Sequence, residues 1–211
     1  MKITVHLLNP KKVKTDIVKE LSSEVRKRVI SSKLASKIED AAQKIISKNL
    51  NNSETVLEIL SGGPLQGELG IPDSQKGTFE SILNSVLDNV KVEAKLKSLT
   101  TKIDLQITVS FNMDLSAYKA SGTYSTEKGQ LIPWFQWLTE LGDRVIVRNF
   151  DSEGGHSKQS RTGDMIMVRG GGWRVPPQHA GSPGDNFVTK AIDGSLPELT
   201  NEMSRIIKGA F

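Results

Sequence analysis

Cysteine is absent from the 211-residue sequence, which excludes disulfides and thiolate metal sites and fits a reducing cytosol. Long hydrophobic runs are absent too, since no stretch approaches the roughly 18 apolar residues of a membrane-spanning helix. The N-terminal MKITVHLLNPKK runs into lysines and has no small-residue cleavage site. We therefore expect a first β-strand there, not a signal peptide, and no association with a membrane.

Aromatic and other apolar residues are scarce. Aromatic residues make up 5% of the chain and hydrophobic residues 36%, which is a lean core for a chain of this length. Such a composition favours either a small domain with long extensions or a protein stabilised by assembly. The formal net charge of +4 permits contact with nucleic acid or with an acidic partner without requiring it.

Motifs for metals, nucleotides and nucleophiles are also missing. The three histidines lie far apart, with no H-x-x-x-H or H-E-x-x-H spacing. The stretch SGGPLQGELG (61–70) lacks the Gly-Lys-Ser/Thr ending of a Walker A loop, and no G-x-S-x-G marks a nucleophile. We predict no catalytic residue, no cofactor, no metal site and no small-molecule substrate, so the protein is not expected to be an enzyme.

The first half of the chain has the periodicity of amphipathic helices. Asn9-Pro10 is a helix-start signal, and apolar residues then recur at about every fourth position through residue 46. This pattern predicts one helix of about forty residues, or two helices joined near Ser31-Ser32. Two shorter helices are predicted after residues 53 and 73.

The pattern changes to a period of two near the middle of the chain. Apolar and polar residues alternate over 91–97 and again over 102–111, which is the clearest strand signal in the sequence. The connection at 99–102 is short enough for a hairpin, so antiparallel pairing is expected. Further elements are predicted as strands at 118–124, 144–150 and 164–168, a short helix after Pro133, and helices at 186–192 and 197–208.

The segment RGGGWRVPPQHAGSPGDNF (169–187) has the glycines of a phosphate-binding or catalytic loop. However, Pro176-Pro177 lack the N–H groups that a phosphate cradle needs, and no G-x-G-x-x-G opens a helix directly. We interpret the segment as a crossover, in which Gly170 to Gly172 end a strand and the prolines stiffen an extended run.

Helices at both ends of a run of strands indicate an α+β fold. A long N-terminal helix and C-terminal helices are expected to pack on a small, mainly antiparallel β-sheet. We predict a single domain over residues 1–211, with a helical insertion at about 53–90 and a mobile loop at about 151–163.

Aromatic residues cluster at Trp134, Phe135 and Trp137. Core packing is the default interpretation, and the alternative is an anchor at a protein–protein interface, where Trp is enriched. Trp173 beside Arg174 has the same ambiguity, because Arg can also stack on Trp. The candidate interface residues are Trp134, Trp137, Arg169, Trp173, Arg174 and Phe187.

The stretches SRTGDMIMV (160–168) and QHAGSPGDNFVTKAI (178–192) resemble a TG turn ahead of a strand and a C-terminal helix start in tail-completion proteins of long-tailed bacteriophages. In physical terms the Gly181–Gly184 turn is tight, Asp185 or Asn186 caps the next helix, and Phe187 pins that helix to the sheet. The family resembled is the head–tail joining and minor tail group, of the lambda tail protein Z type. The chain departs from it at 53–90 and in LIPWFQWLTELGD (131–143).

This resemblance implies a non-enzymatic virion component. Such proteins assemble as homo-oligomeric rings, usually hexamers, beside connector or neck proteins and tail-tube or sheath proteins. The resemblance implies a place in the virion, at the head–tail junction or tail, and in the host bacterial cytoplasm during assembly. DNA passes through and is bound only weakly. The station stays open between neck ring, tail terminator and another minor tail position.

Two other hypotheses remain. A nucleic-acid-binding module would use the basic face of the first helix together with Arg161, Arg169 and Arg174. The residues that could face DNA are Lys91, Lys95, Lys97 and Arg161. A hydrolase would use His179, Ser182 and an acidic partner.

Overall fold

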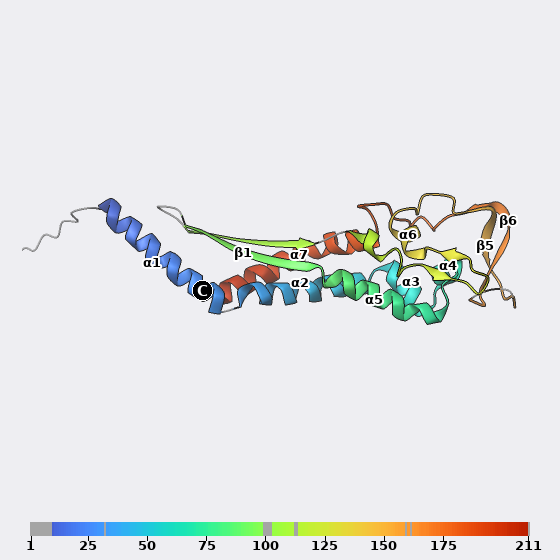
Figure 1. Cartoon of the computed structure of the whole chain (residues 1–211), viewed down its shortest axis with the longest axis horizontal. Coiled ribbons are helices and arrows are strands. Elements are labelled where there is room, and N and C mark those ends of the chain that lie inside the picture. The colour runs from blue at the N-terminus through green and yellow to red at the C-terminus, as the bar shows by residue number, and fades with distance from the viewer. Residues whose placement is uncertain are drawn as a thin grey trace, which may run out of the picture. The chain divides into compact units, whose positions relative to one another are not determined.

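The computed structural model describes residues 10–31, 33–98, 103–111, 114–158, 160 and 162–210. Over these residues the fold is α+β, as predicted, and its strands form three separate two-stranded antiparallel sheets instead of one small sheet. The elements labelled in Figure 1 are, in chain order, α1 (Pro10–Ser31), α2 (Leu34–Asn51), α3 (Glu54–Ser61), α4 (Pro64–Leu69), a 3₁₀ turn (Asp73–Gln75), α5 (Lys76–Leu87), β1 (Val90–Ser98), β2 (Ile103–Phe111), a second 3₁₀ turn (Leu115–Tyr118), β3 (Tyr124–Ser125), β4 (Leu131–Ile132), α6 (Trp134–Thr139), β5 (Val147–Gly154), β6 (Met165–Trp173) and α7 (Phe187–Ala210). The predicted N-terminal strand lies outside the described residues.

The chain divides into two compact units, where we had predicted one domain. Unit 1 comprises residues 1–42, 90–111 and 199–211, and unit 2 comprises residues 43–89 and 112–198. The predicted helical insertion corresponds to α3, α4 and α5, which belong to unit 2.

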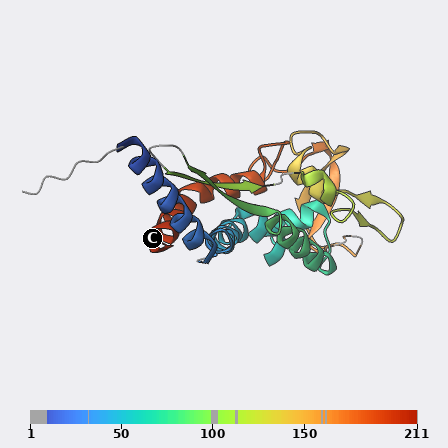
Figure 2. The same cartoon turned by 60° about the vertical axis from the view of Figure 1, so that its left-hand side comes forward.

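Unit 1 contains α1 and the β1–β2 hairpin. The strands pair from Val90 opposite Phe111 to Ser98 opposite Ile103, so the predicted antiparallel hairpin is confirmed, and they run side by side in both views (Figures 1 and 2). The helix α1 contacts β1. The Glu39 carboxylate of α2 accepts a hydrogen bond from the Val92 N–H at 3.1 Å, which ties the outer edge of β1 to α2.

The long N-terminal pattern forms two helices, the second of the two predicted alternatives. The helix α1 ends at Ser31 and α2 begins at Leu34. Between them, Lys33 has a φ of 50°, a left-handed conformation that cannot continue a right-handed helix. The left-handed backbone at Lys33 therefore separates α1 from α2.

The core of unit 2 is built from aromatic rings on three helices. Phe79 of α5 lies 5.4 Å from Trp134 of α6 and 6.2 Å from Phe187 of α7, measured between ring centroids. Phe187 also meets Phe135 of α6 edge-on at 6.4 Å. Phe187 therefore fixes α7 to α5 and α6, and the expectation that it pins the helix to a sheet is wrong.

Three predicted elements differ because tertiary contacts override the local pattern. Of the strand predicted at 118–124, only Tyr124 lies in a strand, as the first residue of β3. Tyr118 instead ends the 3₁₀ turn Leu115–Tyr118, and its hydroxyl donates to the Ser85 carbonyl at 3.0 Å. The two C-terminal helical patterns are one helix, with Pro197 inside α7. The predicted loop at 151–163 begins as strand, because β5 continues to Gly154, which pairs with Met165.

The start of α7 is capped by Asn186. Its Oδ1 accepts hydrogen bonds from the N–H groups of Val188 at 3.1 Å and Thr189 at 3.2 Å, and Thr189 Oγ1 accepts from the Asn186 N–H at 2.8 Å. Asp185 instead closes the preceding tight turn by backbone hydrogen bonds in both directions with Ser182. Of the two predicted capping residues, Asn186 is the cap.

Substituting Asn186→Ala is expected to lower the free energy of unfolding by about 1–2 kcal/mol, because two first-turn N–H groups lose their acceptor. Asp185→Ala removes only an exposed pair with Lys190 (3.4 Å) and is expected to cost well under about 1 kcal/mol. Urea unfolding followed by tryptophan fluorescence measures this, since Trp134, Trp137 and Trp173 all lie in unit 2. Equal losses in the two variants would contradict the assignment of the cap.

Candidate functional site

Over the described part of the chain, no helix is both long and apolar enough to cross a membrane. Within the same residues, no three His, Asp or Glu side chains gather in a way that would hold a metal ion. The remaining candidate sites are the glycine-rich segment and the cavities of unit 2.

We had predicted that Gly170 to Gly172 end a strand. They instead lie inside β6, which continues to Trp173. The Asp151 carboxylate of β5 accepts hydrogen bonds from the N–H groups of Gly171 at 2.9 Å and Gly172 at 3.1 Å. A Cβ at Gly170 would overlap the same carboxylate. Glycine is needed at position 170 because a side chain would overlap this carboxylate. The carboxylate also occupies the amides of Gly171 and Gly172, which are therefore not free to cradle a phosphate.

Trp173 joins β6 to two helices. Its side chain is 5% exposed, its Nε1 donates to Glu68 Oε2 of α4 at 3.3 Å, and its ring meets Trp137 of α6 edge-on at 5.8 Å. Burial raises the pKa of Glu68, the Trp173 hydrogen bond lowers it, and the Glu58 carboxylate raises it further. Trp173 is thus a packing and hydrogen-bonding residue of unit 2.

The other candidate interface residues divide by burial. Trp134 and Phe187 are 0% and 5% exposed and form the core. Trp137 is partly exposed, and Arg169 and Arg174 are exposed. Of the six candidates, these last three present surface that a partner can contact.

Among the described side chains, the lysines predicted to face DNA lie beside acidic residues. Lys91 and Lys95 are exposed on β1, but Glu93 lies between them and pairs with Lys95 at 2.6 Å. Lys97 stands opposite Asp104 in the strand register. Arg161 lies outside the described residues. The charge on this strand is therefore mixed.

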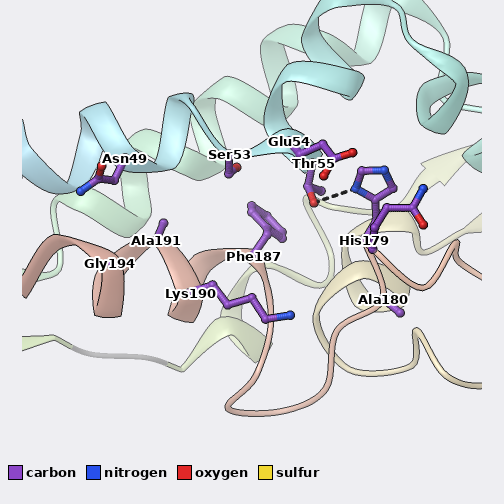
Figure 3. A pocket seen from close by; sticks show the side chains of 11 residues that line it. Asn49, Ser53, Glu54, Thr55, His179, Ala180, Phe187, Lys190, Ala191 and Gly194 are labelled. Atoms are coloured by element: carbon purple, nitrogen blue, oxygen red, sulfur yellow. Dashed lines mark hydrogen bonds between the residues drawn. The ribbon is translucent and has the colours of Figure 1, made fainter.

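A cavity of about 330 Å³ lies in unit 2 beside His179 (Figure 3). It is lined by the end of α2, the start of α3, the turn at 178–180 and the first turns of α7. The imidazole of His179 is 5% exposed, and its Nδ1 lies 3.1 Å from Thr55 Oγ1. Desolvation lowers the pKa of His179, and the Glu54 and Glu58 carboxylates oppose that shift.

The hydrogen bond with Thr55 determines which ring nitrogen of His179 carries the proton. Thr55 is 4% exposed, and in the described part of the chain its hydroxyl has no other acceptor. A buried hydroxyl is normally satisfied, so it donates to Nδ1 and leaves the proton of the neutral ring on Nε2. Ser182, proposed as a partner nucleophile, lies in the Asp185 turn and does not line the cavity.

Sequence reasoning identified His179 but missed Thr55, Glu54 and Lys190, which share its cavity. Thr55 lies 124 residues from His179, and no local motif marks it. With the geometry established, the chain was compared with known proteins: no family model, curated protein or solved structure matches it.

Gly170→Ala is expected to destabilise the protein by about 1–3 kcal/mol, because the new methyl group displaces the Asp151 carboxylate. In an Asp151→Ala background the same substitution should cost much less, since the overlapping atoms are gone. Unfolding of the two single variants and the double variant measures this coupling. Strictly additive costs would show that the carboxylate does not lie over Gly170.

Glu68→Gln is expected to change the pH dependence of stability. A raised pKa means that folded Glu68 keeps its proton where the unfolded chain loses it, so wild-type stability falls as pH rises through this range. The variant lacks this loss, and its stability relative to wild type should increase as the pH rises above the ordinary pKa of a glutamate. Glu127→Gln, at an exposed turn, should show no such trend in urea unfolding followed by circular dichroism; a flat difference for Glu68→Gln would contradict the pKa direction.

Proposed function

We propose that the protein is a structural virion component of the neck or tail of a long-tailed bacteriophage, which forms a ring that joins or completes the head–tail junction. The resemblance of residues 160–168 and 178–192 to tail-completion proteins suggests the class. The observation that carries the proposal is the uncovered apolar surface of α1.

The helix α1 is amphipathic, yet none of its side chains described from Lys11 to Val29 is buried. Ile17 is 53% exposed and Leu21 is 52% exposed, one helical turn apart on the same side of the helix. Surface helices of soluble proteins usually bury such a stripe. A partner that covers Ile17 and Leu21 would supply the burial that the isolated chain lacks.

The β1–β2 hairpin has a second incomplete surface. Because the Val92 N–H bonds to Glu39 and not to β2, its cross-strand partner Val109 directs its own N–H and C=O groups away from β1. In the described residues β2 pairs with no other strand. Its alternate residues Leu105, Ile107 and Val109 are only partly buried. Two-stranded hairpins are marginal alone, and an open edge of this kind accepts a strand from another chain.

The mixed charge of β1 supports weak contact with passing DNA over a dedicated nucleic-acid-binding function. Each phosphate contact adds salt-dependent affinity, and the Glu93–Lys95 pair offsets one of the positive charges that would make such contacts. Tight nucleic-acid binding remains an outcome that the experiment below can detect.

Ile17→Asp combined with Leu21→Asp is expected to abolish ring formation, because a charge in an apolar contact loses its hydration without gaining a partner. Electron microscopy and mass photometry of the purified chain, alone and with connector and tail-tube proteins, measure assembly. Ser23→Asp, on an exposed position of the same helix, adds one charge and should leave rings intact.

Unfolding curves for both variants separate loss of assembly from loss of folding. A wild-type protein that stays monomeric and binds neither connector nor tail tube would refute the proposed function. Sub-micromolar duplex binding that weakens steeply with salt would favour the nucleic-acid alternative.

A further inference from the structure

We propose that the cavity beside His179 is a binding site for a carboxylate group. This site is distinct from the α1 and β2 surfaces and does not depend on the proposed function. It lies wholly within unit 2, between the N-terminus of α3, the turn at 178–180 and the start of α7 (Figure 3).

The buried His179 side chain carries a ring nitrogen, Nε2, that has no partner among the described residues. His179 is 5% exposed, and its Nδ1 lies 3.1 Å from Thr55 Oγ1, from which we infer that Nδ1 accepts because the buried hydroxyl has no other described acceptor. In the described residues Nε2 has no hydrogen-bond partner, and it is not among the polar atoms enclosed by protein. The ring lines the cavity, and a neutral imidazole whose Nδ1 accepts carries its N–H on Nε2, which suits an oxygen acceptor.

The N-terminus of α3 lies at the same cavity. Ser53 caps α3 by accepting from the Val56 N–H at 3.4 Å. The earlier N–H groups of Glu54 and Thr55 make no hydrogen bond within the described chain. Both residues line the cavity with His179. Free N–H groups at the positive end of a helix dipole attract an anion.

The charged groups at the rim decide between a carboxylate and a cation. Lys190 of α7 lines the cavity and has only an exposed partner, Asp185 at 3.4 Å. The Glu54 carboxylate repels a bound anion, whereas the Nε2–H of His179 and the N–H groups at the start of α3 attract one. The walls are small or aromatic, from Ala180, Phe187 and Ala191, and they suit a short aliphatic stem behind the carboxylate.

Carboxylate binding is expected to be coupled to protonation of His179. The free ring has a lowered pKa because of burial, and a bound carboxylate would raise that pKa by favouring the charged imidazole. Linkage then requires binding to tighten as pH falls from about 7 towards about 5.5, above the range where the ligand itself becomes protonated. Glu54 and Glu58 of α3 already favour the charged ring, while Lys190 opposes it.

The test is an NMR titration of the full chain with sodium acetate, against sodium chloride at equal ionic strength. The His179 Cε1–H resonance, assigned by its absence in His179→Gln, should shift saturably with acetate only, and more tightly at lower pH. Lys190→Gln should weaken acetate binding about two- to fivefold, and Glu54→Gln should strengthen it by a similar factor. Lys128→Gln, at an exposed turn outside the cavity, is the matched control and should change nothing.

A dilution series without acetate distinguishes two sources of the carboxylate. A His179 resonance that moves with protein concentration, and that acetate restores, would indicate a side chain from a second copy; a response to acetate alone would indicate a free small carboxylate. The proposal is overturned if His179 responds equally to acetate and chloride, or if Glu54→Gln weakens binding.

Discussion

The contact of Phe187 with Phe79 and Phe135 connects α5, α6 and α7 into one core. Truncating one such buried ring typically costs about 3–5 kcal/mol, a large part of the stability of a domain this size. Phe187 directly follows the capping residue Asn186, so the start of α7 and its packing are fixed together. The Gly142 N–H also bonds to the Gly181 carbonyl at 3.1 Å, which holds the preceding turn, and therefore one wall of the His179 cavity, against the end of α6.

The elements predicted correctly are those encoded by neighbouring residues. The β1–β2 hairpin follows from strict alternation, and the Asn186 cap from one side chain and the next three N–H groups. The wrong predictions depend on partners distant in sequence. Tyr118 ends a 3₁₀ turn where a strand was predicted to begin, and its hydroxyl bonds to Ser85, 33 residues away. The cavity shows the same limit, because His179 alone says nothing about Thr55, and only the folded chain brings the two together.

The glycine-rich segment illustrates how similar compositions serve different purposes. Gly171 and Gly172 do offer backbone amides to an anion, as in a phosphate loop, but the anion is the Asp151 carboxylate of the adjacent strand. The cross-strand register with its irregularity between Arg148 and Phe150 brings that carboxylate into place. A few residues further on, the donors around His179 have no such acceptor among the described residues. Unused donors, more than glycine content, therefore distinguish a candidate binding site from a completed structural motif.

The size of the uncovered surface limits how assembly can work. Completing the burial of Ile17 and Leu21, each already about half covered, would contribute only about 1 kcal/mol per residue. Association of two proteins costs at least about 4 kcal/mol in lost translational and rotational freedom. The α1 stripe is therefore too small to hold a ring by itself. In the proposed ring, hydrogen bonds along the open β2 edge or contacts with the proposed neighbouring proteins would have to supply the difference, so the proposed ring should be most stable when those neighbours are present.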